Sequence, residues 1–98
     1  ELILSGGFNV YPTEVEAAVR SMPQVADVAV VGLPAGAAGE TVVAGVVLAP
    51  GATLTLEELR EHAGRTLPRY ALPRRLEILQ EVMRRLVREE VLRRDARR

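Results

Sequence analysis

Residues 2–16 read LILSGGFNVYPTEVE, and this stretch joins two short apolar segments to the start of a helix through a pair of glycines. Gly6 and Gly7 permit the positive φ angles of a tight turn and let other groups approach the backbone closely. The apolar segments Leu2–Leu4 and Phe8–Val10 are therefore predicted to pair as a hairpin. Taken alone, a glycine pair before a strand is typical of a simple hairpin turn and says little about function.

Outward from this stretch, the apolar periodicity alternates between the helical and the extended pattern. Two of the expected helices begin with the spacing of a capping box, in Thr13 with Glu16 and in Thr55 with Glu58. The predicted elements after the hairpin are a helix at 13–22, strands at 25–31 and 41–48, a helix that starts after Thr55, an extended connector at 69–72, an alternating strand at 75–80 with one face in the core, and a helix from residue 81 to the end. This order predicts an α+β fold, in which a small mixed sheet of about three core strands plus the N-terminal hairpin is flanked by three helices.

The composition indicates a single domain, residues 1–98, with an aliphatic core. Hydrophobic residues make up 48% of the chain, but the aromatic ones are only one Phe and two Tyr. Cysteine is absent and His62 is the single histidine, so no metal site is expected and His62 is interpreted as a surface or half-buried structural residue. No apolar run approaches the length that spans a bilayer, so the chain is predicted to have no membrane span and to be cytoplasmic.

The charge is distributed unevenly, although the net charge is zero. The thirteen basic residues are all arginines, and seven of them lie within residues 81–98. A balanced charge gives no general attraction to nucleic acid, and the arginine-rich end lacks the aromatic residues that stack on bases. No nucleic-acid partner is therefore predicted.

Residues 2–16 closely resemble the segment that opens the C-terminal domain of acyl- and aryl-CoA synthetases, of the long- and medium-chain fatty-acid-CoA ligase type, in the adenylate-forming superfamily. The resemblance continues through about residue 80 and returns in part at 91–98. It implies a lid that follows a large N-terminal ATP-binding domain and rotates between an adenylation pose and a thioester-forming pose. The full-length ligases use ATP with Mg²⁺ and CoA, and no cofactor is expected on the isolated lid.

The resemblance also assigns candidate site residues. Ser5, Gly6 and Gly7 match the glycine loop that lines the passage for the pantetheine arm of CoA. Gly39 and Glu40 match a pair near the face presented to the large domain.

A third matching segment, RYALP at 69–73, resembles the family's connector, whose basic residue meets phosphates of CoA. Ala71 occupies that basic position here. If this contact with the CoA phosphates is kept, the resemblance implies that Arg69 or Arg74 makes it.

The last segment departs from the family pattern. Aligning VLRR at 91–94 without a gap places Glu89 on the family's glycine and Glu90 on its catalytic lysine. In the family, that lysine holds the carboxylate and the α-phosphate of ATP during adenylation. A glutamate has the opposite charge and the chain contains no lysine, so no catalytic residue is assigned, and the isolated chain is expected to be inactive in adenylation.

Residues 81–98 instead have the pattern of an atypical amphipathic helix. Its apolar stripe is formed by Val82, Met83, Leu86, Val87 and Val91, while Arg84, Arg85, Arg88, Glu89 and Arg93 are predicted to lie mainly outside it. This stripe either packs on the parent sheet or faces a second copy, in which case the chain is a non-catalytic scaffold or an engineered interaction module that self-associates. Binding of an anion or a membrane surface by the arginines is a third interpretation.

Overall fold

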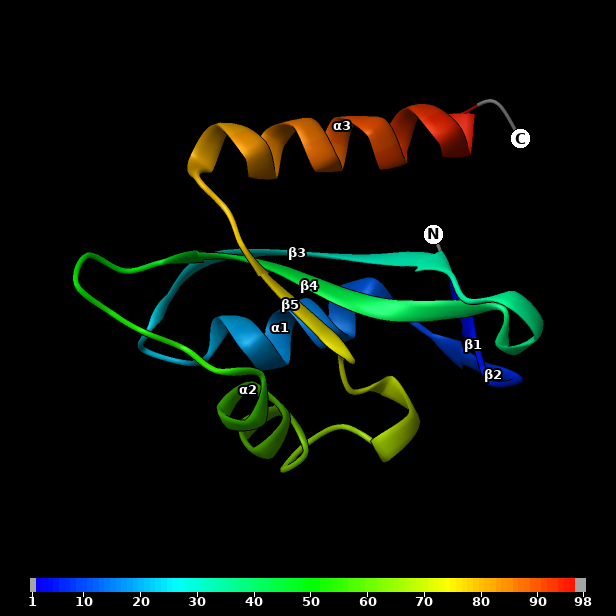
Figure 1. The fold of residues 1–98 in the computed structure, drawn as a ribbon, viewed down its shortest axis with the longest axis horizontal. Coiled ribbons are helices and arrows are strands. Elements are labelled where there is room, and N and C mark those ends of the chain that lie inside the picture. The colour runs from blue at the N-terminus through cyan, green and yellow to red at the C-terminus, as the bar shows by residue number, and fades with distance from the viewer. Residues whose placement is uncertain (1, 97–98) are drawn as a thin grey trace.

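The computed structural model describes the backbone of residues 2–96 and the side chains of residues 2–80 and 85–94 (Figure 1). Within this part of the chain, the order of elements is β1 (Ile3–Ser5), β2 (Phe8–Val10), α1 (Pro12–Arg20), β3 (Val25–Pro34), a 3-10 turn η1 (Gly36–Ala38), β4 (Glu40–Leu48), α2 (Leu56–Ala63), a 3-10 turn η2 (Arg69–Ala71), β5 (Arg75–Ile78) and α3 (Glu81–Ala96). The predicted α+β class and order of elements are confirmed.

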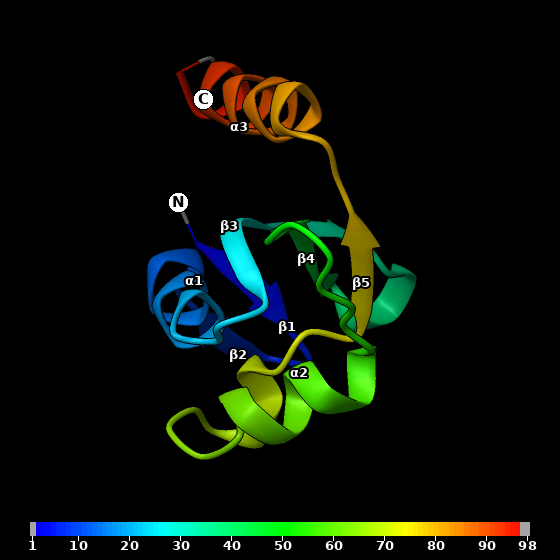
Figure 2. The ribbon, with the colours of Figure 1, turned by 90° about the vertical axis from the view of Figure 1, so that its left-hand side faces the viewer.

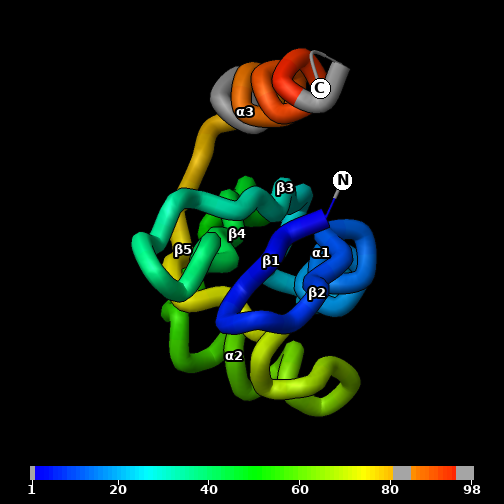
Figure 3. The backbone as a smooth tube through the Cα atoms, turned by 90° about the vertical axis from the view of Figure 1, so that its right-hand side faces the viewer, coloured from blue at the N-terminus to red at the C-terminus, as the bar shows by residue number. Residues whose placement is uncertain are grey.

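The sheet has the strand order β3-β4-β5 and is mixed, as predicted. β3 and β4 are antiparallel, whereas β5 runs parallel to β4. A parallel neighbour requires a crossover connection, and α2 lies within the segment that makes it. Figures 1, 2 and 3 show α1 and α2 on one face of the sheet and α3 over the other. β1 and β2 form the separate hairpin predicted across the glycine pair.

The main core lies between the sheet and the layer of α1 and α2. As the composition indicated, it is aliphatic, and its fully buried side chains include Val10, Val15, Val19, Val28, Val30, Val42, Val46 and Leu59. Among the described side chains, those of α3 do not belong to this cluster. The described part of α3 therefore lies outside this main core.

The two predicted capping boxes have different outcomes. Thr55 accepts a hydrogen bond from the Glu58 amide at 3.2 Å, and the Glu58 carboxylate accepts one from the Thr55 amide at 2.8 Å. The prediction at Thr13 is wrong, because α1 already begins at Pro12, whose fixed φ suits the first helical position. Glu16 consequently lies farther into the helix and turns inward to β3.

Two further expectations about the C-terminal half need correction. The connector is not extended, because residues 69–71 form a 3-10 turn that brings Ala71 and Leu72 into buried positions. In β5, Leu76 packs against the core, but Ile78 is 53% exposed. β5 is an edge strand, so its side chains have sheet neighbours on one side only.

No helix within residues 2–96 combines the length and the apolar character needed to cross a membrane. Likewise, the described side chains include no group of three His, Asp or Glu placed to hold a metal ion.

We predict that Thr55→Ala destabilises the domain by about 1 kcal/mol, because it removes the side-chain acceptor at the start of α2. The free energy of unfolding, measured by urea denaturation, checks this value. Thr13→Ala is the matched control. It removes an exposed threonine inside α1 and should change the stability by less than about 0.5 kcal/mol. Equal losses in the two variants would contradict the assignment of the caps.

Candidate functional site

The structure brings the predicted glycine loop next to the predicted Gly39–Glu40 pair. Gly6 and Gly7 adopt φ angles of 56° and 85°, as the turn prediction requires. The Gly6 amide donates a hydrogen bond to the Ala38 carbonyl at 2.9 Å, and Ser5 forms an antiparallel bridge with Gly39. The β1–β2 turn is therefore fastened to the loop that connects β3 to β4.

Gly39 and Glu40 hold β1 against this loop. Gly39 has φ 85° and ψ −103°, a conformation that side chains strongly disfavour. A Cβ atom at this position would lie 2.8 Å from the Leu4 carbonyl oxygen. Glu40 Oε1 accepts a hydrogen bond from the Leu4 amide at 3.1 Å. Both residues therefore have a structural role within the domain, and their place at a domain interface stays a prediction.

A hollow of about 300 Å³ lies beside this junction. It is lined by Ser5, Gly6, Phe8, Ala35, Ala38, Glu40, Thr41, Tyr70 and Arg74. Most of these side chains are small, and the wall at Gly6 is bare backbone. Gly7 is exposed at the tip of the turn, with open space where a side chain would be.

A second hollow of about 690 Å³ adjoins the first. Its lining residues are Phe8, Leu56, Arg60, Arg69, Tyr70 and Arg74. Phe8 and Tyr70 line both hollows and stack on each other, with ring centroids 4.4 Å apart and planes inclined by 15°. Both rings are substantially exposed, at 52% and 41%. This stack is the boundary that the two hollows share.

The second hollow carries positive charge. Arg69 and Arg74 are exposed, whereas Arg60 is half-buried and donates a hydrogen bond to the Pro73 carbonyl at 2.7 Å. Guanidinium groups are suited to bind phosphate. The first hollow therefore has a wall of bare backbone at Gly6, and the second hollow is suited to bind an anion.

Sequence reasoning missed part of this site. Phe8 and Tyr70 stand within the motifs SGGFN and RYALP, but only their neighbours were considered. Their contact joins residues far apart in the chain, and Arg60 belongs to α2, outside either motif. The available local signal was that Phe8 follows the glycine pair and that Tyr70 lies in the short segment between Pro68 and Pro73.

The interpretation of His62 as a half-buried structural residue is confirmed. His62 Nε2 lies 2.7 Å from Ser21 Oγ, and the Ser21 hydroxyl donates to the Ala18 carbonyl at 2.7 Å. A hydroxyl has one proton, so Ser21 accepts a hydrogen bond from His62. Nothing in this geometry activates Ser21 as a nucleophile, and the pair joins α1 to α2.

In the terminal segment, α3 continues without a break through Glu90, the residue predicted to align with the family's lysine. Glu90 forms ion pairs on its own helix, with Arg93 at 2.9 Å and Arg94 at 3.3 Å. Glu89 is exposed. The carboxylate at position 90 is thus partly neutralised by two arginines within one helical turn.

The apolar stripe of α3 is oriented differently from the expected pattern. Val87 and Val91 are half-buried, but Leu86 is 55% exposed. Val82 and Met83 lie outside the described side chains. Arg88, which the periodicity placed away from the stripe, points inward and lies 2.8 Å from Glu16 of α1. The inward face of α3 therefore includes a charged residue that pattern reading assigned to solvent.

Comparison with known proteins gives the family. Residues 14–86 match the AMP-binding enzyme C-terminal domain, and the chain belongs to this family. The match begins after the glycine loop and ends before Arg88, so the roles predicted for Ser5, Gly6, Gly7, Glu89 and Glu90 rest on residues outside it.

Individual relatives agree with this assignment. The chain is 40% identical over 76 residues to the long-chain-fatty-acid–CoA ligase FadD13 of Mycobacterium tuberculosis, covering 78% of this chain and 15% of the relative. It is 45% identical over 86 residues to a probable 2-succinylbenzoate–CoA ligase of the same species, covering 87% and 22%. A crystal structure of a Brucella canis acyl-CoA synthetase superposes with a TM-score of 0.79 at 32% identity, covering 92% of this chain and 19% of that one. The chain thus spans at most about a fifth of the length of these ligases.

We predict that Gly39→Ala destabilises the domain by about 2–3 kcal/mol, because it adds a contact with the Leu4 carbonyl to an unfavourable backbone conformation. Gly36→Ala is the control, since Gly36 has φ 62° but open space around it. It should cost only about 1 kcal/mol. The difference in the free energy of unfolding tests the fit at Gly39, and similar costs at both glycines would refute it.

Proposed function

We propose that this chain is the C-terminal lid of an ATP-dependent acyl-CoA ligase, which converts a carboxylic acid, ATP and CoA into acyl-CoA, AMP and pyrophosphate. Relatives named as CoA ligases for fatty acids and for 2-succinylbenzoate support this activity. Its partner is an N-terminal ATP-binding domain, because the relatives are several times longer than this chain. Fatty acids are the proposed substrate class, and a cytoplasmic location stays a prediction.

The pair of hollows at the Phe8–Tyr70 stack is the observation that carries this proposal. The pantetheine arm of CoA is thin, and the wall that Ser5 and Gly6 contribute to the first hollow is small or bare backbone. The phosphates of CoA are anionic, and the adjoining hollow presents Arg69 and Arg74. The exposed aromatic stack offers a flat surface to the adenine base. Each chemical part of CoA therefore has a matching surface on this side of the lid.

The side of the lid that would serve adenylation departs from the family pattern. Glu90 lies on α3, which covers the opposite face of the sheet from α2, the helix that carries Arg60 (Figure 1). If Glu90 replaces the family's lysine, it brings a carboxylate toward the ATP phosphates and repels them. The ion pairs of Glu90 with Arg93 and Arg94 reduce this repulsion but do not supply the missing ammonium group. We infer that this lid serves thioester formation and fails in adenylation.

The self-associating scaffold is the less favoured alternative. Val87 and Val91 are half-buried within a single chain, while Leu86 is the exposed member of the stripe among the described side chains. Most of the described stripe is thus already covered by the parent domain. This favours packing on the sheet over a helix shared between two copies.

The two half-reactions of a chimaeric ligase test the proposal. Residues 1–98 would replace the C-terminal domain of FadD13, and pyrophosphate release would report adenylation. The chimaera should adenylate a fatty acid at least about 100-fold more slowly than the parent, the usual cost of losing an electrostatic contact to a transition state. Glu89→Gly combined with Glu90→Lys should recover at least about tenfold of that loss.

Arg93→Lys is the control for this rescue, because it places a lysine on the same helix one turn away. It should leave adenylation unchanged. Thioester formation from preformed acyl-adenylate and CoA should proceed in the original chimaera. Adenylation at the parent rate would contradict the inference about Glu90, and failure of thioester formation would contradict the proposed function.

We also predict that Arg69→Met with Arg74→Met raises the KM for CoA at least about tenfold in the thioester half-reaction, since charge-assisted contacts to phosphate are lost. Adenylation should not change further. Arg65→Met removes an exposed arginine that lies beyond the end of α2 and outside the lining of the hollows, and its KM for CoA should match that of the unchanged chimaera. An unchanged KM in the double variant would remove the arginines from the CoA site.

A further inference from the structure

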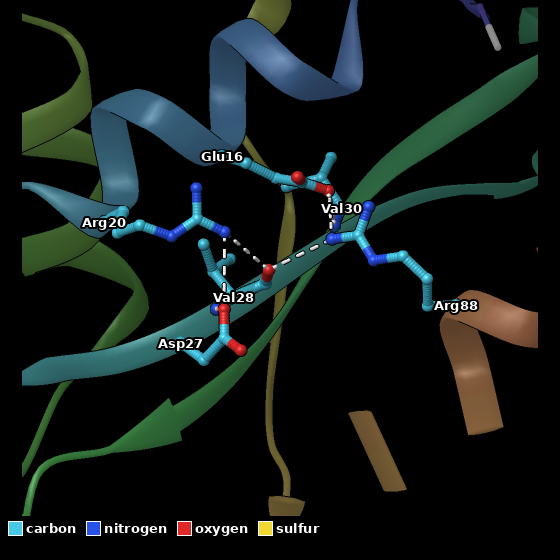
Figure 4. Close-up of polar contacts among 6 residues, drawn as sticks. All are labelled: Glu16, Arg20, Asp27, Val28, Val30 and Arg88. Atoms are coloured by element: carbon cyan, nitrogen blue, oxygen red, sulfur yellow. Dashed lines mark hydrogen bonds and ion pairs between the residues drawn. The ribbon is translucent and has the colours of Figure 1, made fainter. Parts of the chain in front are cut away.

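On the outer edge of β3, the backbone groups of Val28 and Val30 form hydrogen bonds with charged side chains rather than with another strand. β3 is an end strand of the sheet, and its residues Val28 and Val30 direct backbone groups outward. The Val30 amide donates to Glu16 Oε2 at 3.0 Å, and the Val28 carbonyl accepts from Arg88 at 3.3 Å and from Arg20 at 3.4 Å. Figure 4 shows these groups meeting along the edge of the strand.

Glu16 and Arg88 form the central contact of this arrangement. Arg88 Nη2 lies 2.8 Å from Glu16 Oε2, and the side chains are 31% and 6% exposed, respectively. A carboxylate buried to this extent requires a charged or hydrogen-bonding partner. Because α1 and α3 lie on opposite faces of the sheet, this ion pair connects the two faces around the edge of β3.

The other described side chains of α3 add little apolar burial to this contact. Leu86 and Leu92 are 55% and 57% exposed, and the described side chains of α3 contribute nothing to the main core cluster. A very small gap separates the helix from β3, lined by Ala29, Val30, Val31, Arg88, Val91 and Leu92. Among the described side chains of α3, the apolar contact with β3 is therefore limited, and Arg88 provides the charged contact.

The chain is anchored immediately before α3. The Leu79 amide donates to the Val46 carbonyl at 2.8 Å. The Leu79 side chain also fills the space that Gly45 leaves on β4, where a Cβ would collide with it. Gln80 is exposed and is the single residue between this anchor and the start of α3 at Glu81. It is thus placed to act as a hinge.

We propose that α3 is a releasable strap, hinged at Gln80 and locked by the Arg88–Glu16 ion pair. When the ion pair opens, α3 leaves the sheet as one unit and the remainder of the domain stays folded. Release exposes the apolar strip on that face, formed by Ala29, Val31 and Val43, of which Val31 and Val43 are direct partners in the β3–β4 register. This inference concerns packing within the chain and is independent of the proposed function.

Amide hydrogen exchange of the full chain, followed by NMR, tests the lock. Arg88→Met removes the guanidinium group but keeps most of the apolar stem. Glu16→Gln removes the charge but keeps an oxygen that accepts from the Val30 amide. In both variants the amides of residues 87–92 should exchange at least about tenfold faster, the effect expected from losing a charged hydrogen bond, while those of Val30 and Val46 keep their protection.

Arg94→Met is the matched control, because Arg94 pairs with Glu90 on the exposed side of the same helix. It should leave the exchange of residues 87–92 unchanged. The double variant with Glu16→Gln and Arg88→Met should exchange no faster than Arg88→Met alone, since both substitutions remove one interaction.

Three results would overturn the proposal. The first is unchanged exchange of α3 in both single variants, which would show that another contact holds the helix. The second is equal acceleration of α3 and β4, which would show that α3 opens only when the whole domain unfolds. The third is unprotected exchange of residues 87–92 in the unaltered chain, which would show that the strap is not closed.

Discussion

The antiparallel ladder between β3 and β4 is the constraint on which the rest of this domain depends. It pairs residues from Val25–Leu48 to Pro34–Glu40, and its inner face carries the valines that α1 and α2 cover. The same ladder fixes where its connecting loop emerges, and that loop holds Gly39 beside Ser5. The hollow at the glycine loop therefore exists because two long strands turn back at this end of the sheet.

The candidate site residues lie on two sides of that ladder. The glycine loop, the aromatic stack and three arginines gather near the hairpin and α2, whereas the acidic positions 89 and 90 lie on the helix over the other face. Under the proposed function, this separation would let the lid present a different surface in each of two poses.

Local patterns in the sequence predicted the features that depend on neighbouring residues. β-Branched runs located β3 and β4, the glycine pair located the hairpin, and Thr55 with Glu58 located the start of α2. The same spacing at Thr13 with Glu16 was misleading, because α1 begins one residue earlier, at Pro12, and Glu16 instead contacts Arg88, 72 positions away in the chain. Long-range contacts also explain why Arg88 was assigned to solvent and why the stack of Phe8 on Tyr70 was not anticipated. Periodicity identifies which residues can be buried, but not which distant charge or ring will meet them.

The two edge strands of the sheet, β3 and β5, are shielded from pairing with strands of other molecules by different means. A long end strand such as β3 would normally offer its free backbone groups to strands of other molecules, which is a route to aggregation. At Val28 and Val30, side chains of Glu16, Arg20 and Arg88 occupy these groups with charged atoms that a foreign strand would have to displace. The opposite end strand, β5, is only four residues long and carries the exposed ion pair of Arg75 with Glu77. Both features oppose the addition of a strand from another molecule to this valine-rich sheet.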